Sequence, residues 1–267
     1  KLLLEKGAKP NVLYSAPDLQ SSPRQSRSPA KVAKATPLLC AVEARNPTLA
    51  SLLLDHSADP NLSDPVSGTT PLIESLSVGN DTLVRLLLKH GANPNLTPKD
   101  GCPPLARLFN HTPASRVARA ALLLDHGADP NAEISDRLAG NKTRALIVAL
   151  ENGCDDLATL LLERGADPNL SNGLGVTALM EACKGGREKL VRTLLEKKVN
   201  VNAADQNGQT ALARAVEVSA PLVRLLLKAG ALPDSPDHNG RTPLHRSAVF
   251  LSERTPGSPT PDSVLSE

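Results

Sequence analysis

One phrase recurs along this chain, and its repetition constrains the fold more than any other feature. The phrase consists of Leu-Leu, two variable residues, Gly-Ala, and a short polar segment that closes on Asn. Five clear copies and two weaker ones close at positions 11, 61, 95, 131, 169, 202 and 234. After the first copy the spacing is 34, 36, 38, 33 and 32 residues. A nearly fixed period of this length is typical of structural repeats that each contact only their neighbours.

A second phrase lies between the copies of the first. It begins, from clear to degraded forms, at Thr36, Thr70, Thr242, Thr177, Thr210, Pro103 and Arg144. Thr followed by Pro predicts a helix start, because Thr can cap free N–H groups and Pro is tolerated in the first turn. The Gly of the first phrase predicts a helix end, because Gly adopts the left-handed conformation readily. Ser57 and Lys198 take the place of this Gly in two copies.

Two short helices are therefore expected in each repeat. In one copy they are predicted at Leu179–Lys184 and Lys189–Glu196, with Gly185-Gly186 turning the chain between them. The polar segment 202–210 is predicted to form a turn with Asn-Gly at its tip.

Together these phrases resemble the ankyrin repeat, whose marks are a period near 33, a Thr-Pro-Leu-His helix start and the Leu-Leu, Gly-Ala, Asn close. The resemblance covers roughly residues 1–11 and 36–253, in about seven repeats of which the first and last are incomplete. It implies an all-α fold, an ankyrin-repeat solenoid of stacked helix-turn-helix units with β-hairpin-like finger turns. It also implies protein binding on a concave face made of the fingers and the first helix of each repeat.

Four segments are expected on this basis. Residues 1–11 form the end of a truncated repeat, and residues 36–253 form the array. Residues 12–35 are predicted to be a disordered finger insertion, and residues 254–267 a disordered tail rich in Pro and Ser. Ser22 and Ser28 precede Pro among basic residues, so the insertion is either a variable loop or a loop regulated by phosphorylation. The unusual start and the missing end caps suggest a part of a longer protein.

Composition excludes several classes of function. The chain has 30 basic and 28 acidic residues, no Trp, one Tyr and two Phe, so neither the basic excess nor the stacking aromatics of a nucleic-acid binder are present. No apolar run approaches the roughly 18 residues of a membrane span. We expect partners to be other proteins, with no nucleic acid, no cofactor and no membrane span; the oligomeric state is left open.

The cysteine and histidine residues fit structural roles better than roles in a catalytic or metal site. The cysteines at 40, 102, 154 and 183 lack metal-ligand spacing and suggest separate thiols in a reducing, intracellular compartment, cytoplasmic or nuclear. His56, His90 and His126 hold the same place in three repeats, which favours a repeat-structural role over metal binding. His245 is expected to hydrogen-bond a neighbouring turn. No phosphate loop, nucleophile elbow or metalloprotease motif is present, so the chain is predicted not to be an enzyme.

The resemblance points to a set of surface residues as a candidate binding site. Positions four, seven and eight residues after each helix start are expected to be exposed, and the charged residues there are Glu43, Glu74, Arg107, Glu151, Glu181, Lys184, Arg214 and Glu217. The finger residues chosen with them are Asp205, Gln206, Asn207, His238 and Arg241. The five Glu residues suggest an acidic ladder that prefers a basic or extended peptide, although Glu is also common on soluble helices.

Three functions remain open at this stage. The first is a protein-binding scaffold or adaptor. The second is the substrate-recruiting arm of an enzyme, such as a ubiquitin ligase or a kinase, whose catalytic domain lies outside this sequence. The third is the intracellular arm of a channel.

Overall fold

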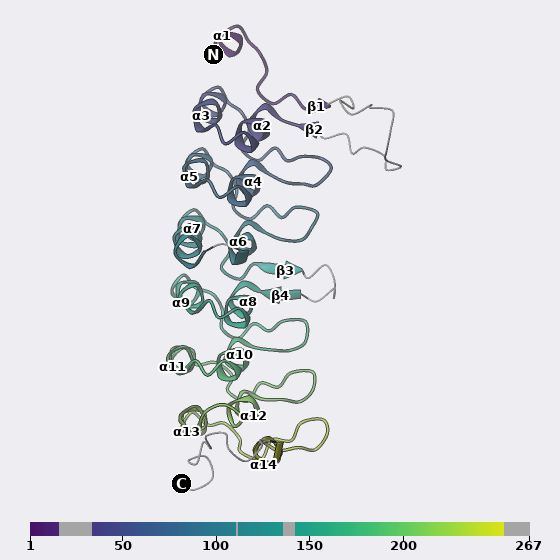
Figure 1. Ribbon diagram of the computed structural model, residues 1–267, viewed down its shortest axis with the longest axis vertical. Helices are drawn as coiled ribbons and strands as arrows, with labels where there is room; N and C mark the ends of the chain where they lie inside the picture. The colour runs from purple at the N-terminus through teal and green to yellow at the C-terminus, as the bar shows by residue number, and fades with distance from the viewer. Residues whose placement is uncertain (16–33, 111, 136–141, 254–267) are drawn as a thin grey trace, which may run out of the picture. The chain divides into compact units, whose positions relative to one another are not determined.

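The computed structural model describes residues 1–15, 34–110, 112–135 and 142–253. The chain divides into two compact units, Lys1–Arg137 and Leu138–Glu267, and each is built of short helices joined by finger-like turns (Figure 1). The expected disorder at residues 12–35 and 254–267 falls mostly or wholly outside the described residues, as do Ser22 and Ser28.

Unit 1 holds a single short helix followed by three helix pairs. Its elements are α1 (Leu2–Glu5), β1 (Tyr14–Ser15), β2 (Lys34–Ala35), α2 (Pro37–Glu43), α3 (Pro47–Asp55), α4 (Pro71–Ser77), α5 (Asp81–Lys89), α6 (Pro104–Arg107), the 3-10 turn η1 (Leu108–Asn110), α7 (Pro113–Asp125) and β3 (Glu133–Ser135). Between its two helices, the repeat of α6 and α7 has three more residues than the other repeats, next to Phe109. The extra length coincides with η1 and with the late start of α7.

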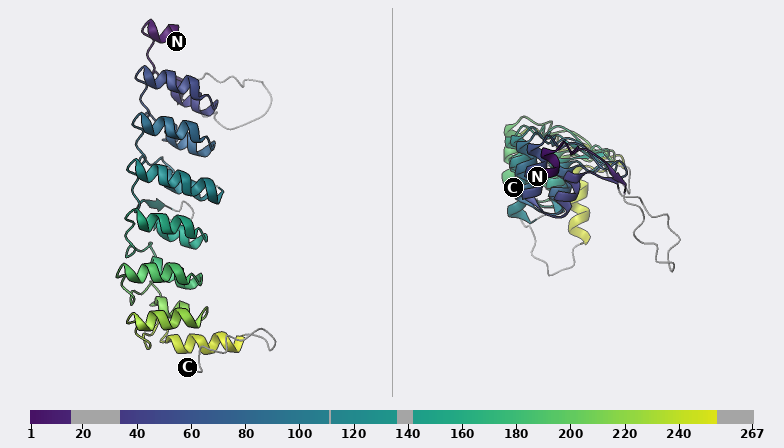
Figure 2. Two further views of the ribbon diagram at one scale, coloured as in Figure 1. Left: turned by 90° about the vertical axis from the view of Figure 1, so that its left-hand side faces the viewer. Right: turned by 90° about the horizontal axis from the view of Figure 1, so that it is seen from above.

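Unit 2 holds three helix pairs followed by a single helix. Its elements are β4 (Lys142–Arg144), α8 (Ala145–Glu151), α9 (Asp155–Glu163), α10 (Ala178–Lys184), α11 (Glu188–Glu196), α12 (Ala211–Ala215), α13 (Ala220–Lys228) and α14 (Pro243–Glu253). The helices predicted at Leu179–Lys184 and Lys189–Glu196 are confirmed as α10 and α11, each beginning one residue earlier than expected. In the left view of Figure 2 the helices within each unit run side by side.

The helix starts follow from the Thr residues of the second phrase. Thr36 Oγ1 accepts a hydrogen bond from the Leu39 N–H at 3.1 Å, and Thr210 Oγ1 accepts one from the Ala213 N–H at 3.3 Å. Each bond satisfies a donor that a helix otherwise leaves free at its first turn. The predicted capping role of Thr is therefore confirmed.

The helix ends follow from a left-handed residue after each Leu-Leu run. Gly91 has φ of 83° after α5, and the Ala92 N–H donates to the Leu87 carbonyl at 3.0 Å across it. Ser57 and Lys198, which replace Gly, hold the same conformation with φ of 67° and 55°. The position therefore sets the backbone conformation even where the residue carries a Cβ, at a modest cost in strain.

The core consists of leucine, alanine and valine side chains between neighbouring helices. In unit 1, α4 packs on α2, α5 and α6, and in unit 2, α10 packs on α8, α11 and α12. Leu87 and Leu161, the first leucines of two closing phrases, are completely buried. Because the helices of adjacent pairs pack on one another, burial is shared between neighbours.

The fingers that join the helix pairs are hairpin-like, as expected. β1 and β2 pair antiparallel, with Tyr14 opposite Ala35, and these strands frame the described ends of the long first finger. Two further fingers close with single antiparallel bridges, Ser171 with Thr177 and Ala204 with Thr210. The all-α repeat fold with finger turns is therefore confirmed.

Within each unit, closing Asn residues join a repeat to the next repeat along the chain. Asn61 Nδ2 donates to the Gly91 carbonyl at 3.2 Å, and Asn61 Oδ1 accepts from the Asn93 N–H at 2.7 Å. Asn95 does the same with the Gly127 carbonyl and the Asp129 N–H, each at 2.8 Å. In unit 2, Asn202 bonds the Gly230 carbonyl and the Leu232 N–H. The recurrence of Asn thus has a structural cause, since an amide can donate and accept at once.

None of the described helices is both long enough and apolar enough to span a bilayer. All four cysteines are free thiols; Cys154 and Cys183 are buried, whereas Cys40 is exposed on α2.

Candidate protein-binding surface

In each unit the first helices and the fingers lie on one side. These helices are α2, α4 and α6 in unit 1 and α8, α10, α12 and α14 in unit 2, and the fingers extend from them to the right in Figure 1. The second helices lie on the opposite side of each unit. The charged residues proposed from the sequence lie on this finger and first-helix face.

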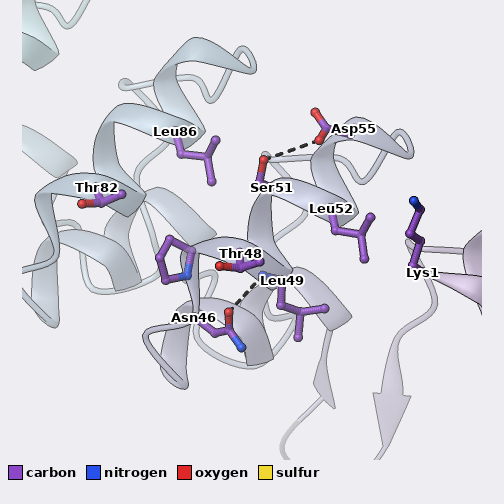
Figure 3. Close-up of a pocket in the computed structure, with 10 residues that line it drawn as sticks. Lys1, Asn46, Thr48, Leu49, Ser51, Leu52, Asp55, Thr82 and Leu86 are labelled. Atoms are coloured by element: carbon purple, nitrogen blue, oxygen red, sulfur yellow. Dashed lines mark hydrogen bonds between the residues drawn. The ribbon is translucent and has the colours of Figure 1, made fainter.

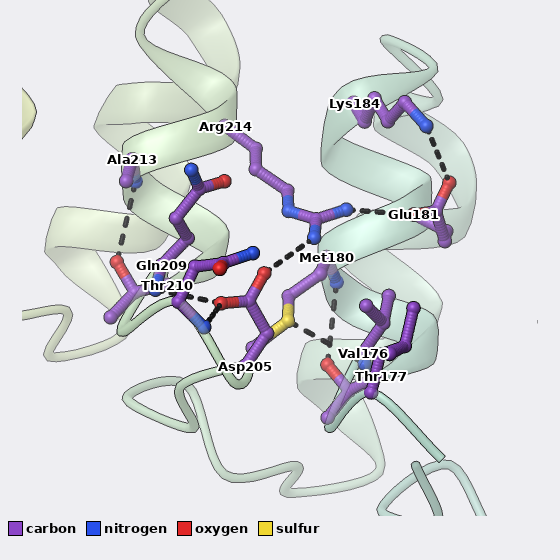
Figure 4. Close-up of polar contacts among 12 residues, drawn as sticks. Val176, Thr177, Met180, Glu181, Lys184, Asp205, Gln209, Thr210, Ala213 and Arg214 are labelled. Atoms are coloured by element: carbon purple, nitrogen blue, oxygen red, sulfur yellow. Dashed lines mark hydrogen bonds and ion pairs between the residues drawn. The ribbon is translucent and has the colours of Figure 1, made fainter. Parts of the chain in front are cut away.

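An arginine on α12 links two repeats within unit 2. Arg214 Nη1 donates to Glu181 Oε1 on α10 at 2.7 Å, and Arg214 Nη2 donates to Asp205 Oδ2 in the finger at 2.8 Å (Figure 4). The side chains of Glu181 and Asp205 are only 6% and 4% exposed. Lys184 Nζ lies 3.5 Å from the other oxygen of Glu181. Arg214 and Lys184 thus compensate the charge of the buried Glu181 carboxylate.

Asp205 also organises its own finger. Asp205 Oδ1 accepts hydrogen bonds from the Asn207 N–H at 2.8 Å and the Gln209 N–H at 3.0 Å. Burial acts to raise the pKa of Asp205, but the bonds from Gln209, Arg214 and Asn207 outweigh it and hold this pKa below its ordinary value.

Two other first helices carry an arginine at the same register position. Arg246 on α14 donates through Nη2 to Glu217 Oε1, with the two atoms 2.7 Å apart, and its Nη1 lies 3.9 Å from Asp237 Oδ2 in the finger. Arg107 on α6 pairs with Asp100 of its own finger. Each arginine lies four residues after its helix start, and this register position points toward the finger and, for Arg214 and Arg246, also toward the preceding repeat.

Two residues expected to be exposed are in fact buried. Glu181 and Asp205 are 5% and 8% exposed, because Arg214 and the finger backbone enclose them. The expectation that they offer free side chains to a partner is therefore wrong. Glu217 is partly exposed but bonded to Arg246. Sequence position placed these carboxylates on the correct face without showing which of them an adjacent arginine neutralises.

Three of the five Glu residues are not paired with a cation among the described residues. Glu43 is exposed, Glu74 is half-buried and Glu151 is exposed, and none forms an ion pair with another described residue. Burial, and then the charge of Glu43, raise the pKa of Glu74, although Arg107 opposes this shift. Burial, and then the charge of Glu181, likewise raise the pKa of Glu151, opposed by Lys184 and Arg214. A cation placed next to a carboxyl group whose pKa is raised in this way would stabilise its charged form.

The fingertips are tied to one another within unit 2. Gln206 Nε2 donates to the Gly173 carbonyl at 2.7 Å, and the Asn207 carbonyl accepts from the His238 N–H at 2.9 Å. The side chains of Gln206, Asn207, His238 and Arg241 are exposed, as expected. These fingertips therefore present polar side chains from fixed positions.

Two hollows have different surroundings. A groove of about 450 Å³ on the first-helix face of unit 2 is lined by Lys184, Gln209, Arg214, Glu217, Val218 and Arg246. Val218 and Gln209 are not among the site residues predicted from charge, although Val218 lies at one of the expected register positions. A larger hollow of about 860 Å³ lies at the second helices of unit 1 (Figure 3), where its wall includes Leu49, Leu52 and Leu86.

The histidines take the structural positions that the repeat suggests. His56, His90 and His126 each cap the C-terminal end of a second helix. His245 Nδ1 lies 2.8 Å from Thr242 Oγ1 at the start of its own helix, rather than at a neighbouring turn. Among the described residues, no group of three or more His, Cys, Asp or Glu side chains could hold a metal ion.

Comparison with known proteins agrees with this geometry. A family model described as "Ankyrin repeats (3 copies)" matches residues 1–100 and 146–237. The crystal structure of the ankyrin repeat domain of Bcl-3, described as a unique member of the IκB protein family, is similar with a TM-score of 0.61 and 27% sequence identity. That match covers 82% of this chain and 98% of the Bcl-3 domain. No curated protein sequence matches the chain.

Proposed function

This chain belongs to the ankyrin repeat family, and from that premise we propose that it is a scaffold or adaptor that binds other proteins through its fingers and first helices. Ankyrin repeats generally act as protein–protein interaction modules. The balanced charge and the four free thiols support an intracellular setting, cytoplasmic or nuclear.

The observation that carries the proposal is a face that presents polar side chains from successive repeats. In each unit, adjacent first helices bring charged residues to the same side while their leucines are buried behind. A partner segment that lies across several repeats can therefore contact each in turn. This arrangement favours recognition over chemistry, which needs groups converging on one reacting atom.

The open carboxylates indicate the chemistry of one contact. Glu43 on α2 and Glu74 on α4 lie close enough for the charge of one to raise the pKa of the other. A Lys or Arg side chain placed between them would relieve this repulsion. We propose that unit 1 receives a basic or extended segment of a partner at these two residues.

Charge reversal of both residues tests the proposal. The intact chain is used for affinity capture, and the Kd of each recovered partner is measured by calorimetry. We expect Glu43→Lys with Glu74→Lys to weaken the partner that binds this face by about tenfold, since two attractive contacts become repulsive.

A matched control reverses two exposed glutamates on second helices, Glu163→Lys with Glu196→Lys, and should leave Kd unchanged. If every partner binds the two double variants equally well, the first-helix face is not the binding surface. The alternative role, a recruiting arm of a ubiquitin ligase or kinase, predicts that the captured partners are modified by the full-length protein.

A further inference from the structure

We propose that unit 2 pairs with unit 2 of a second copy of this chain through an apolar end face on α13 and α14. The end face consists of Leu227 on α13, Leu232 in the turn after it, and Leu244 and Ala248 on α14. All four side chains are exposed, and the three leucines are 42%, 57% and 62% exposed. The inference goes beyond the proposed function, because it concerns self-association and uses none of the residues assigned to partner binding.

Leu244 is exposed at a register position that is buried in the six described helix pairs. The leucines two residues after the helix start in those pairs are at most 3% exposed, and they are Leu38, Leu72, Leu105, Leu146, Leu179 and Leu212. In each of those pairs a second helix packs on the first. By contrast, α14 packs on α12, and no second helix follows it among the described residues (Figure 1). Leu244 therefore lies on a surface that the repeat normally covers.

Leu227 lacks a cover for the same reason. It is the second leucine of its closing phrase, and the equivalent leucines Leu54 and Leu88 are buried. Those two belong to α3, which packs on α5, and to α5, which packs on α7. The described part of the chain has no second helix after α13. Leu227 and Leu244 therefore both face the side of unit 2 on which another helix pair would pack.

Leu232 departs from the repeat at a position where the other copies carry a polar side chain with a structural role. In five copies the side chain at this position accepts a hydrogen bond from the N–H two residues later, and these residues are Asp59, Asn93, Asp129, Asp167 and Asn200. A leucine cannot form this bond, and it places an apolar side chain in water. Together with Leu227 and Leu244 it forms an exposed apolar surface, which is typical of a protein interface.

The sequence after α14 does not favour the second helix that would cover the end face. Residues 254–261 include Pro256, Pro259 and Pro261. Proline inside a helix removes a hydrogen bond and clashes with the preceding turn, and these prolines are only two or three residues apart. The second helices α3, α5, α9, α11 and α13 each need nine residues. We therefore assign the cover of the end face to a second molecule.

The end face is complementary to a second copy of itself. Leu244 and Ala248 lie one turn apart on the same side of α14. Two α14 helices that pack antiparallel across a two-fold axis place the large side chain of each copy against the small side chain of the other. At the rim Lys228 and Asp234 are both exposed, so the rim carries both signs of charge and two copies need not repel each other.

Sedimentation velocity of the intact chain from about 1 μM to about 100 μM tests the proposal. We expect the mass of one chain at low concentration and of two chains at high concentration, with nothing larger, because a two-fold contact closes on itself. Leu244→Asp should raise the dimer Kd by at least about a hundredfold, since each copy would bury a carboxylate. Leu174→Asp changes a fingertip leucine of unit 2 that is also exposed, and this control should leave the Kd unchanged.

Leu232→Asn restores the residue type of the repeat, so it should preserve the helical circular dichroism signal while it weakens the dimer by about tenfold. A single chain at every concentration, assemblies larger than two chains, or a dimer that Leu244→Asp and Leu174→Asp weaken equally would each overturn the inference. None of these results bears on the proposed function, which depends on Glu43 and Glu74 in unit 1 and is tested by charge reversal there.

Discussion

At the residue scale, one register position decides how charge is distributed on the candidate surface. The fourth residue after the helix start is Glu74 on α4, Arg107 on α6, Glu181 on α10 and Arg214 on α12. Arg214 at this position reaches Glu181 of the preceding repeat, and the two form a buried pair. Glu74 and Arg107 do not form such a pair, because Arg107 bonds Asp100. The charge of Arg107 acts on Glu74 only by opposing the rise of its pKa.

Replacing Asp205 with Asn should destabilise unit 2 by about 2 kcal/mol at pH 7, because Arg214 loses an enclosed ionic partner. The folded-state pKa of Asp205 lies below its unfolded value of 3.8, so its stabilisation is complete above about pH 5, declines as the pH falls through 3.8, and is lost below the lowered pKa. Urea unfolding followed by circular dichroism at pH 7 and pH 3 measures both states.

The control is Asp234→Asn, which changes an exposed carboxyl near the end of the next repeat and should cost less than about 0.5 kcal/mol. The difference between wild type and Asp205→Asn should shrink at pH 3. A difference of the same size at both values of pH would mean that the charge of Asp205 contributes nothing.

At the element scale, closing Asn residues couple neighbouring repeats of one unit through the backbone. The amide spans the left-handed residue at the end of the adjacent second helix and the N–H two residues later. Asn61 and Asn95 each begin an Asn-x-Ser/Thr triplet, the sequence at which Asn can be glycosylated. These triplets have a structural explanation, because the Nδ2 atom to which a glycan would be attached donates a hydrogen bond to a carbonyl.

Asn95→Ala removes both inter-repeat bonds and should cost about 1–2 kcal/mol, while Asn95→Asp retains the acceptor for the Asp129 N–H and should cost about half as much. Chemical denaturation of the intact chain gives both values. If Asn95→Asp is as harmful as Asn95→Ala, the contact of the Asn95 oxygen with Asp129 contributes no stability.

The sequence predicts the elements well because each boundary depends on a local rule. Thr210 caps its own helix, and Gly91 ends one, with no information from distant residues. The exposure of Glu181 could not be predicted in this way, since it depends on Arg214, which lies 33 residues later and in the next repeat. Within the predicted acidic ladder, the exposure expected of Glu181 was wrong, because counting charges along one face ignores which of them pair across repeats.

At the scale of the whole molecule, each unit is stabilised by helices that bury one another's leucines. The first leucine of the closing phrase is buried wherever a first helix packs over it, as at Leu53, Leu87, Leu123, Leu161, Leu194 and Leu226. Leu3 holds the same register position in α1 and is 76% exposed. Burial of this leucine is therefore a property of the neighbouring helices and not of the phrase itself.

Leu87→Ala and Leu161→Ala test this account in the two units, and Leu3→Ala is the matched control. We expect each of the first two changes to lower the free energy of unfolding by about 2–5 kcal/mol, because each removes a completely buried side chain and leaves a cavity. The control should cost less than about 0.5 kcal/mol, since its side chain is already in water. Denaturant titrations followed by circular dichroism measure all three, and they should be fitted without assuming one transition, because repeat arrays can unfold in parts. A cost for Leu3→Ala equal to that for Leu87→Ala would show that the leucine contributes through its own helix, and shared burial between neighbours would then not be what stabilises these units.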